Sequence, residues 1–431
     1  MIIRNRIIVA VIVFSYLLLM SIAYTVYIDA PMHKAVVISG YNGDIVYYNP
    51  NNGVIVANGV GTSLLVNKSH GVILSESFKK ACTSGSIVYG ITESAVEDRN
   101  RIFAFDGKAV YAMKFNVSMP DPKLLYCNGD GAIIVGGDIV RGIAVYIISG
   151  FDVEVYYIPY YKPALRDVLL YNDTLYILFE DSVIKAELMG NVTILTPRYL
   201  NTSFNLDRLH LYKGHVVALG SVEYEDSNKL YGAIVYIDKS VMDIIRVGNR
   251  NSKVEVVSYS QGISHILVRP SGDWAKIVEV WRDRPRGVVS IVMSESFVMT
   301  ASGSYNSKIW IGGRLPASGS MIVYEGSSTR PAYIGEGYYI VVEAKPYDKD
   351  LVFITSGVEI DFKEEHLEAM KGPFTTTMEQ SQAIEIREWS GYDLSIYKPY
   401  IDRWVIFLTL FTVSIPSTAI LYRLLGGFIL D

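Results

Sequence analysis

Two cysteines are the residues of this chain whose spacing most directly suggests chemistry. Cys82 and Cys127 are the only cysteines among 431 residues, and each ends an apolar run just before a turn, in Ala-Cys-Thr-Ser-Gly and Tyr-Cys-Asn-Gly. They lie one period of a sequence repeat apart, so equivalent positions in neighbouring units could meet. We expect a disulfide, a bond that persists in oxidising compartments. Two buried thiols that behave as small hydrophobic side chains are the alternative.

Five Asn-x-Ser/Thr sequons are candidate N-glycosylation sites, and an acceptor asparagine must lie on an exposed loop. All five precede residue 202, which leaves the second half of the chain free of glycan for a partner, although chance clustering explains the distribution nearly as well. Two of them, Asn172 and Asn191, fall at expected turns. The candidates are Asn67, Asn116, Asn172, Asn191 and Asn201.

Three polar clusters could hold a metal ion but are better explained as surface charges and turn residues. A zinc site needs three or four ligands, and a calcium loop alternates Asp and Asn around a Gly. Neither pattern occurs in His210 with His215, in Glu364, Glu365, His366 and Glu368, or in Glu223, Glu225 and Asp226. The glycine pairs at Gly136 and Gly312 lack the helix of a phosphate loop. We therefore predict no metal, cofactor or catalytic residue.

Four tryptophans are candidate interface residues, because Trp and Tyr most often anchor protein interfaces. They are Trp274, Trp281, Trp310 and Trp389, all in the half that lacks sequons. Trp274 and Trp281 are seven residues apart, so on one strand they point to opposite faces and at least one should be exposed. Rings that fill space between sheets are the alternative. We expect residues after about 201, with 374–400, to carry the main partner contact.

These residues must be positioned by a repeated β-hairpin. In Asp167–Glu180, two β-branched and aromatic runs flank Asn172-Asp173, a pair that tolerates the left-handed backbone of a tight turn. Similar hairpins follow at intervals of roughly 40 to 48 residues, the period of a four-stranded propeller blade. They are expected at Leu124–Gly136, Leu209–Gly220, Val256–Val268, Phe297–Ile311 and Tyr339–Thr355.

The hairpins resemble those of quinoprotein-like and other divergent β-propellers, in which an apolar strand ends in Asp or Asn, turns, and returns apolar. The clearest examples begin at Ile45, Ile102 and Ala233. The resemblance implies an all-β fold, a β-propeller of seven or eight blades over about residues 35–360. A propeller must close its ring to avoid exposed edges. We expect strands near Ala35–Ala57 to complete the blade that contains Tyr339–Thr355.

Two apolar runs predict transmembrane helices on either side of the propeller. The run 7–28 carries no charged side chain and is long enough to cross about 30 Å of hydrocarbon; a cleaved signal peptide is the alternative. Arg4, Arg6 and Arg423 predict cytoplasmic termini. The expected parts are a cytoplasmic N-terminus (1–6), a transmembrane helix (7–28), an extracytoplasmic propeller (29–361), a juxtamembrane stalk (362–401), a transmembrane helix (402–423) and a cytoplasmic tail (424–431). Lys363–Met370 is expected to be helical.

Composition excludes one class of partner and favours one habitat. The formal net charge is −5 and no basic stretch gives the electrostatic footprint of a nucleic-acid-binding protein. Glutamine occurs at three positions only, and a low content of this thermolabile residue is typical of a thermophile.

We therefore expect a non-enzymatic binding or scaffolding subunit of a cell-envelope complex, with the membrane and an envelope protein as partners. The alternative is a cell-surface hydrolase or lyase that acts on glycan or peptide at the propeller channel. A channel lined by carboxylates or histidines with shifted pKa values would favour the enzyme.

Overall fold

A computed structural model of the chain describes Ser15 and residues 35–397, apart from 68–69, 95–98, 114–120, 130, 139, 141, 163, 188–189, 226–228, 249, 261, 271–274, 282–283, 294–297, 306–307, 316–318, 327–331, 335–337, 347–351 and 390–393. Lys34–Tyr397 forms one compact unit, separate from a second unit that contains both chain ends. All the named elements are β-strands of the first unit. No helix of the described residues is long and apolar enough to span a bilayer. Apart from Ser15, the predicted spans 7–28 and 402–423 lie outside the described residues.

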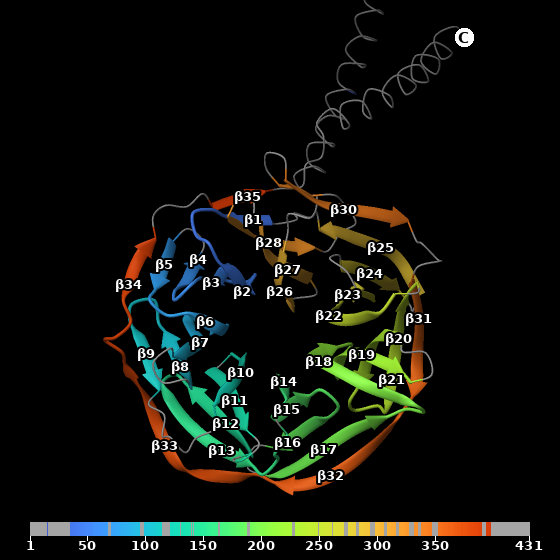
Figure 1. Cartoon of the computed structure of the whole chain (residues 1–431), viewed down its shortest axis with the longest axis horizontal. Helices are drawn as coiled ribbons and strands as arrows, with labels where there is room; N and C mark the ends of the chain where they lie inside the picture. Colours follow the sequence, from blue (N-terminus) through green and yellow to red (C-terminus); the bar gives the residue numbers. More distant parts are fainter. Residues whose placement is uncertain are drawn as a thin grey trace, which may run out of the picture. The chain divides into compact units, whose positions relative to one another are not determined.

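The strands among the described residues form seven units of four antiparallel strands, which we call blades, and Figure 1 shows them around a common centre. Blades 1 to 3 are β2–β5 (Asp44–Asn49, Val54–Asn58, Ser63–Asn67, His70–Leu74), β6–β9 (Phe78–Ser84, Ile87–Ser94, Arg99–Phe105, Val110–Met113) and β10–β13 (Pro122–Cys127, Gly131–Asp138, Gly142–Ser149, Asp152–Ile158). Blades 4 and 5 are β14–β17 (Leu165–Tyr171, Thr174–Phe179, Val183–Glu187, Asn191–Arg198) and β18–β21 (Thr202–Tyr212, His215–Tyr224, Lys229–Tyr236, Val241–Val247). Blade 6 is β22–β25 (Ser252–Ser260, Ile263–Pro270, Ala275–Trp281, Arg284–Met293).

The seventh blade closes the ring with a strand from the start of the described chain. It combines β26–β28 (Val298–Tyr305, Lys308–Leu315, Ser320–Gly326) with β1 (Ala35–Ile38), which pairs with β28 so that Ile38 lies opposite Met321. The innermost strands also contact one another in sequence, from β2 through β26 and back to β2. The fold is therefore all-β and propeller-like, as predicted.

The prediction that an N-terminal strand closes the ring was correct, but the blade assigned to that strand was wrong. Ala35–Ile38 completes the blade of Val298–Gly326, whereas Tyr339–Thr355 does not form a hairpin. Its two halves belong to β30 (Tyr338–Pro346) and β31 (Val352–Glu359), which lie in different sheets. The five other hairpins expected at these intervals each supply the first two strands of a blade, whereas the hairpins that begin at Ile102 and Ala233 supply the third and fourth strands of blades 2 and 5.

The C-terminal strands form a belt around the outside of the ring, orange to red in Figure 1. In chain order they pair with the outer edges of blades 6, 5, 4, 3, 2, 1 and 7, opposite to the order of the blades in the sequence. After β30 and β31 come β32 (Asp361–Glu368), β33 (Met370–Gln380), which spans blades 3 and 2, β34 (Ile386–Trp389) and β35 (Leu394–Tyr397). A short strand, β29 (Ala332–Ile334), pairs with β30.

The belt changes the interpretation of the region expected to be a stalk. Residues 362–401 include most of β32 and all of β33 to β35, and the helix predicted over Lys363–Met370 is wrong. Eight consecutive residues of β32 pair with β17, from Asp361 opposite Arg198 to Glu368 opposite Asn191. Pairing with an open sheet edge satisfies the backbone of this segment despite its helix-favouring composition, because tertiary context overrides local propensity.

Apolar layers between adjacent blades form the core. One cluster joins blades 4 and 5 through Leu178, Leu206 and Met242, all with no exposed surface. The middle strands of a blade are buried on both faces, so they contain continuous apolar runs such as Val216 to Gly220 of β19. This packing holds the inner strands in place around the centre.

Tight turns with left-handed backbone connect the inner hairpins. Asn172 and Asp173 have φ of 48° and 58°, and Lys213 and Gly214 have φ of 51° and 79°. These are the pairs at which the sequence predicted two-residue turns.

Candidate functional site

A cavity of about 840 Å³ lies among the innermost strands. Its lining comes from the inner strand of blades 1 to 5 and 7, with Trp310 of β27, whereas the described residues of β22 contribute none. It reaches the turns that follow β2, β6 and β10, at Asn51, Gly85 and Gly129. A cavity of this size can hold a drug-sized ligand. We call it the channel cavity.

Every inner strand carries a β-bulge where it pairs with the second strand of its blade. The extra residue is Val46, Lys79, Lys123, Arg166, Asp207, Glu255 or Thr300, in blades 1 to 7 respectively. Five of the seven line the channel cavity, all except Lys123 and Glu255. A bulge redirects a side chain without ending the strand. The bulges therefore supply a ring of side chains that is basic in blades 2 to 4 and acidic in blades 5 and 6.

Arg208 and His210 of β18 connect blade 5 to blade 7. The Arg208 guanidinium donates hydrogen bonds to the Ser302 carbonyl at 2.7 Å and to the Ser302 hydroxyl at 3.2 Å. His210 Nδ1 lies 3.3 Å from the Ser304 hydroxyl. Both contacts bypass β22, the inner strand of blade 6. They place the Arg208 guanidinium at the wall of the cavity, where it is bonded to the carbonyl and hydroxyl of Ser302.

Burial and Arg208 shift the titration of His210. Desolvation is the larger cause and the neighbouring guanidinium the smaller, and together they lower the pKa of His210 to about 3. The imidazole is therefore neutral at physiological pH and can donate or accept one hydrogen bond.

Asp167 ties blade 4 to blade 5 at the next position around the ring. Its carboxylate accepts hydrogen bonds from its neighbour Val168 N at 2.9 Å and from Leu209 N of β18 at 2.8 Å. Desolvation raises the pKa of Asp167, and the backbone bonds with the charges of Arg208 and Lys80 oppose that rise without cancelling it. The Asp167 carboxylate thus links blade 4 to blade 5 and also lines the cavity.

Ion pairs outside the cavity neutralise part of the bulge ring. Arg166 lies 3.1 Å from Glu180, and Lys253 lies 3.1 Å from Asp207 and 3.6 Å from Glu255. Arg269 also lies 3.2 Å from Glu255. The acidic side of the ring is therefore compensated by bases, so the cavity keeps its cationic character.

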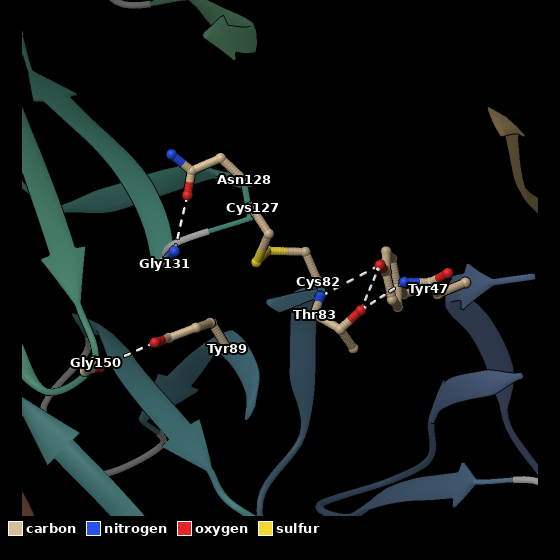
Figure 2. The surroundings of a disulfide bond; sticks show 9 residues. Tyr47, Cys82, Thr83, Tyr89, Cys127, Asn128, Gly131 and Gly150 are labelled. Carbon is tan, nitrogen blue, oxygen red and sulfur yellow. Dashed lines mark hydrogen bonds between the residues drawn. A yellow bond between two sulfur atoms is a disulfide. The ribbon is translucent and has the colours of Figure 1, made fainter. Parts of the chain in front are cut away.

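The predicted disulfide is confirmed and forms part of the cavity wall (Figure 2). Cys82 and Cys127, in the inner strands of blades 2 and 3, are bonded with their Cα atoms 5.7 Å apart. The adjacent Thr83 receives a hydrogen bond from Asn49 at 2.8 Å and lies 3.0 Å from the Tyr47 hydroxyl. Blades 1, 2 and 3 are thus linked in series along the cavity.

Four of the five sequon asparagines lie at exposed positions. Asn172 is in the β14–β15 turn, Asn191 begins β17, Asn67 ends β4 and Asn201 precedes β18. Asn116 lies outside the described residues. Glycosylation of these sites stays a prediction.

Two of the four candidate interface tryptophans are buried, which favours for them the alternative of rings that fill space. Trp310 packs edge-on against Tyr48, with ring centroids 5.7 Å apart, and Trp389 lies in the same apolar cluster. Each ring covers a cross-strand glycine: a Cβ at Gly71 would lie 2.5 Å from the Trp389 ring. These rings fill space in blades 7 and 1. Trp274 lies outside the described residues, and of Trp281 only the backbone, in β24, is described.

The polar clusters considered as metal sites do not come together. His215 pairs with Asp238 at 2.6 Å, whereas His210 faces Ser304. Glu364, Glu365, His366 and Glu368 lie along the exposed strand β32. Glu223 and Glu225 flank the end of β19, and Asp226 lies outside the described residues. Among the described residues no group of three or more metal-ligating side chains is found.

Comparison with known proteins adds little to this geometry. No protein-family model and no curated protein matches the chain. One solved structure that matches, the crystal structure of Chaetomium thermophilum Raptor, shares 9% sequence identity with a TM-score of 0.36, and the match covers 69% of this chain and 30% of that one. The chain thus spans less than a third of that protein's length. Similarity at this level carries no argument about function.

Proposed function

We propose that this chain is a membrane-anchored, extracytoplasmic β-propeller of seven blades that serves as a binding or scaffolding subunit of a cell-envelope complex. The observation that carries the proposal is the pairing of the two ends of the ring. β1 pairs with β35 in blade 7, and Ala35 lies opposite Tyr397. The two apolar runs of the sequence lie within a few residues of this pair, on either side of it in the chain.

This register supports a double anchor with both termini on one side of the membrane. Because β1 and β35 are antiparallel, the start of one and the end of the other lie at the same end of the blade. Only residues 29–34 and 398–401 separate these strands from the two apolar runs in the sequence. Anchors at both positions would restrain the propeller near the bilayer.

The topology is tested by protease treatment of intact cells that express the full chain. We expect the middle region to be digested under conditions that cleave a known surface protein, with both termini protected. A reporter of periplasmic or extracellular location fused after residue 431 should be inactive. Survival of the whole middle region would overturn the extracytoplasmic assignment.

The scaffolding role is tested by co-purification of the full chain in mild detergent. We expect a defined partner to be retained by the parent and lost from Trp281→Ala or Trp274→Ala with an unchanged melting temperature. Trp389→Ala is the matched control: it should lower the melting temperature, because this ring is buried, and keep the partner. Parent protein that purifies alone under every mild condition would contradict the proposal.

A hydrolase or lyase at the channel cavity is the second candidate. The observation that favours it is the presence of two groups with shifted pKa in one cavity, Asp167 raised and His210 lowered. Each already has a structural partner, Leu209 N for Asp167 and Ser304 for His210. An activity on glycan or peptide substrates that disappears in Asp167→Asn and in His210→Gln, while Lys162→Gln keeps it, would favour the enzyme.

A further inference from the structure

The channel cavity has a charge opposite to that of the whole chain. Four cationic side chains line it, Lys79, Lys80, Arg166 and Arg208, against two carboxylates, Asp167 and Asp207. The chain as a whole has a formal net charge of −5. Concentration of positive charge inside a concave site raises the local concentration of anions.

External ion pairs do not remove this excess. Arg166 is compensated by Glu180 and Asp207 by Lys253, neither of which lines the cavity. Lys79 has an interaction of its own. Two cations, Lys80 and Arg208, therefore face one carboxylate, Asp167, which already accepts two backbone hydrogen bonds.

Arg208 is held in place by neutral groups. Its NH1 group donates to a carbonyl and to a hydroxyl of Ser302, and this contact fixes the guanidinium at the wall. A guanidinium has five N–H donors, so donors remain for a ligand. Hydroxyl and amide groups of Thr83, Ser304 and Asn49 line the same cavity.

We propose that the channel cavity binds an anionic small molecule, whose carboxylate, phosphate or sulfate group is held between Lys80 and Arg208. Arg matches the planar or tetrahedral oxygen pairs of these anions through paired N–H donors, and Lys adds a point charge. The neighbouring hydroxyl and amide groups suit the polar remainder of the molecule. The site does not depend on the anchoring or the partner proposed above.

The test uses the full chain in mild detergent at low salt, with isothermal titration calorimetry and thermal unfolding. The probes are inorganic phosphate, sulfate and glucuronate, with uncharged glucose as the control ligand. We expect at least one anion to bind and to raise the melting temperature, whereas glucose does neither. Phosphate or sulfate alone would identify a phosphorylated or sulfated ligand, and glucuronate alone a carboxylated one.

Three variants locate the site. Lys80→Gln should weaken binding roughly tenfold to a hundredfold, since it removes a hydrogen bond to a charged group. The side chain of Lys80 is exposed, so this variant stays informative if Arg208→Gln, which also loses the Ser302 contact, unfolds. Lys162→Gln is the matched control, because it makes the same charge change at a surface ion pair with Asp181. Absence of binding to all three anions at about 10 mM, or equal binding by Lys80→Gln and Lys162→Gln, would overturn the proposal.

Discussion

In blades 1, 4, 5 and 7 the inner strand and the belt strand are the two edges of one five-stranded sheet, yet these edges are protected in different ways. Inner edges are bulged and bonded to the next blade, as in Leu209 N to Asp167, Thr300 to the Ile45 carbonyl and Phe78 N to Ser63. Outer edges are covered by strands from a distant part of the chain. The inner edge thus keeps room for a ligand, whereas the outer edge is closed by added backbone pairs.

The belt in turn presents a new outer edge, and its composition protects that edge. β32 carries Lys363, Glu364, Glu365, His366 and Glu368, and most of its residues are exposed. Charged side chains on an edge strand prevent pairing with another chain. The ring is thus stabilised mainly by apolar packing, and the belt mainly by backbone pairing.

The largest effect should come from deleting Ala35–Ile38. β1 is the strand through which both the ring and the belt close, because it pairs with β28 and with β35. We expect the deletion to abolish the single cooperative unfolding transition, followed by circular dichroism on heating. Deleting Leu394–Tyr397 opens the belt alone and should lower the melting temperature while the transition stays cooperative. Parent-like melting of the β1 deletion would contradict closure of the ring by this strand.

Loss of the disulfide should destabilise the ring by about 4 kcal/mol. The bond closes a loop with a sequence separation of 45 residues, and the chain-entropy model gives this magnitude for a loop of that length. The double variant Cys82→Ala/Cys127→Ala, compared with the parent by urea unfolding, measures it. Non-reducing peptide mapping provides the control, and recovery of two free thiols from the parent would refute the bridge.

A matched pair of leucines compares ring and belt directly. Leu178→Ala in β15 should cost about 3 kcal/mol, because Leu178 has no exposed surface and packs between blades 4 and 5. Leu367→Ala in β32 should cost about 1 kcal/mol or less, because this side chain is only partly buried against the cluster of blades 3 and 4. Equal losses in urea unfolding would show that the belt also depends on apolar packing.

A pH dependence of stability should originate in the inner strand of blade 5. The unfolded chain binds a proton at His210 near pH 6.5 and the folded chain only near pH 3, so the stability is full above pH 6.5 and falls as the pH drops between these values. At pH 5.5 the loss reaches up to about 1.4 kcal/mol. Asp167 acts in the opposite direction, because its raised pKa favours the folded state as the pH falls. His210→Gln should therefore be less destabilised by acid than the parent.

Local sequence patterns predicted the hairpins of the blades, because the residues that form each turn lie between its two strands in the sequence. Asn172-Asp173 and Lys213-Gly214 have the composition that a two-residue turn requires, and both form it. The disulfide was predictable for a related reason: equivalent positions one repeat apart lie on adjacent inner strands. The closing strand was also located, although its partner was misassigned because Tyr338–Pro346 and Val352–Glu359 look like one more hairpin.

No local sequence pattern predicted the belt strands or the ring of bulge residues. β32 alternates poorly, and its Lys-Glu-Glu-His-Leu-Glu-Ala-Met run favours helix, so only its pairing with a strand more than 150 residues earlier reveals its state. The bulge residues share a position and not a chemistry, since they range from Val46 to Lys79 and Asp207. An apolar residue precedes each of them at the repeat interval, and an alignment of the blades on these residues would have found the ring.

The pairing of Ala35 with Tyr397 also determines how the molecule responds to force. A pull along β1 and β35 together moves both strands in the same direction, so it shears β1 against β28 and loads the hydrogen bonds of that ladder at once. A pull that spreads the two ends apart acts on the first pair of β1 and β35 alone and breaks that ladder one bond at a time. The protein should thus resist the first load and yield to the second, which opens the belt while the ring stays closed.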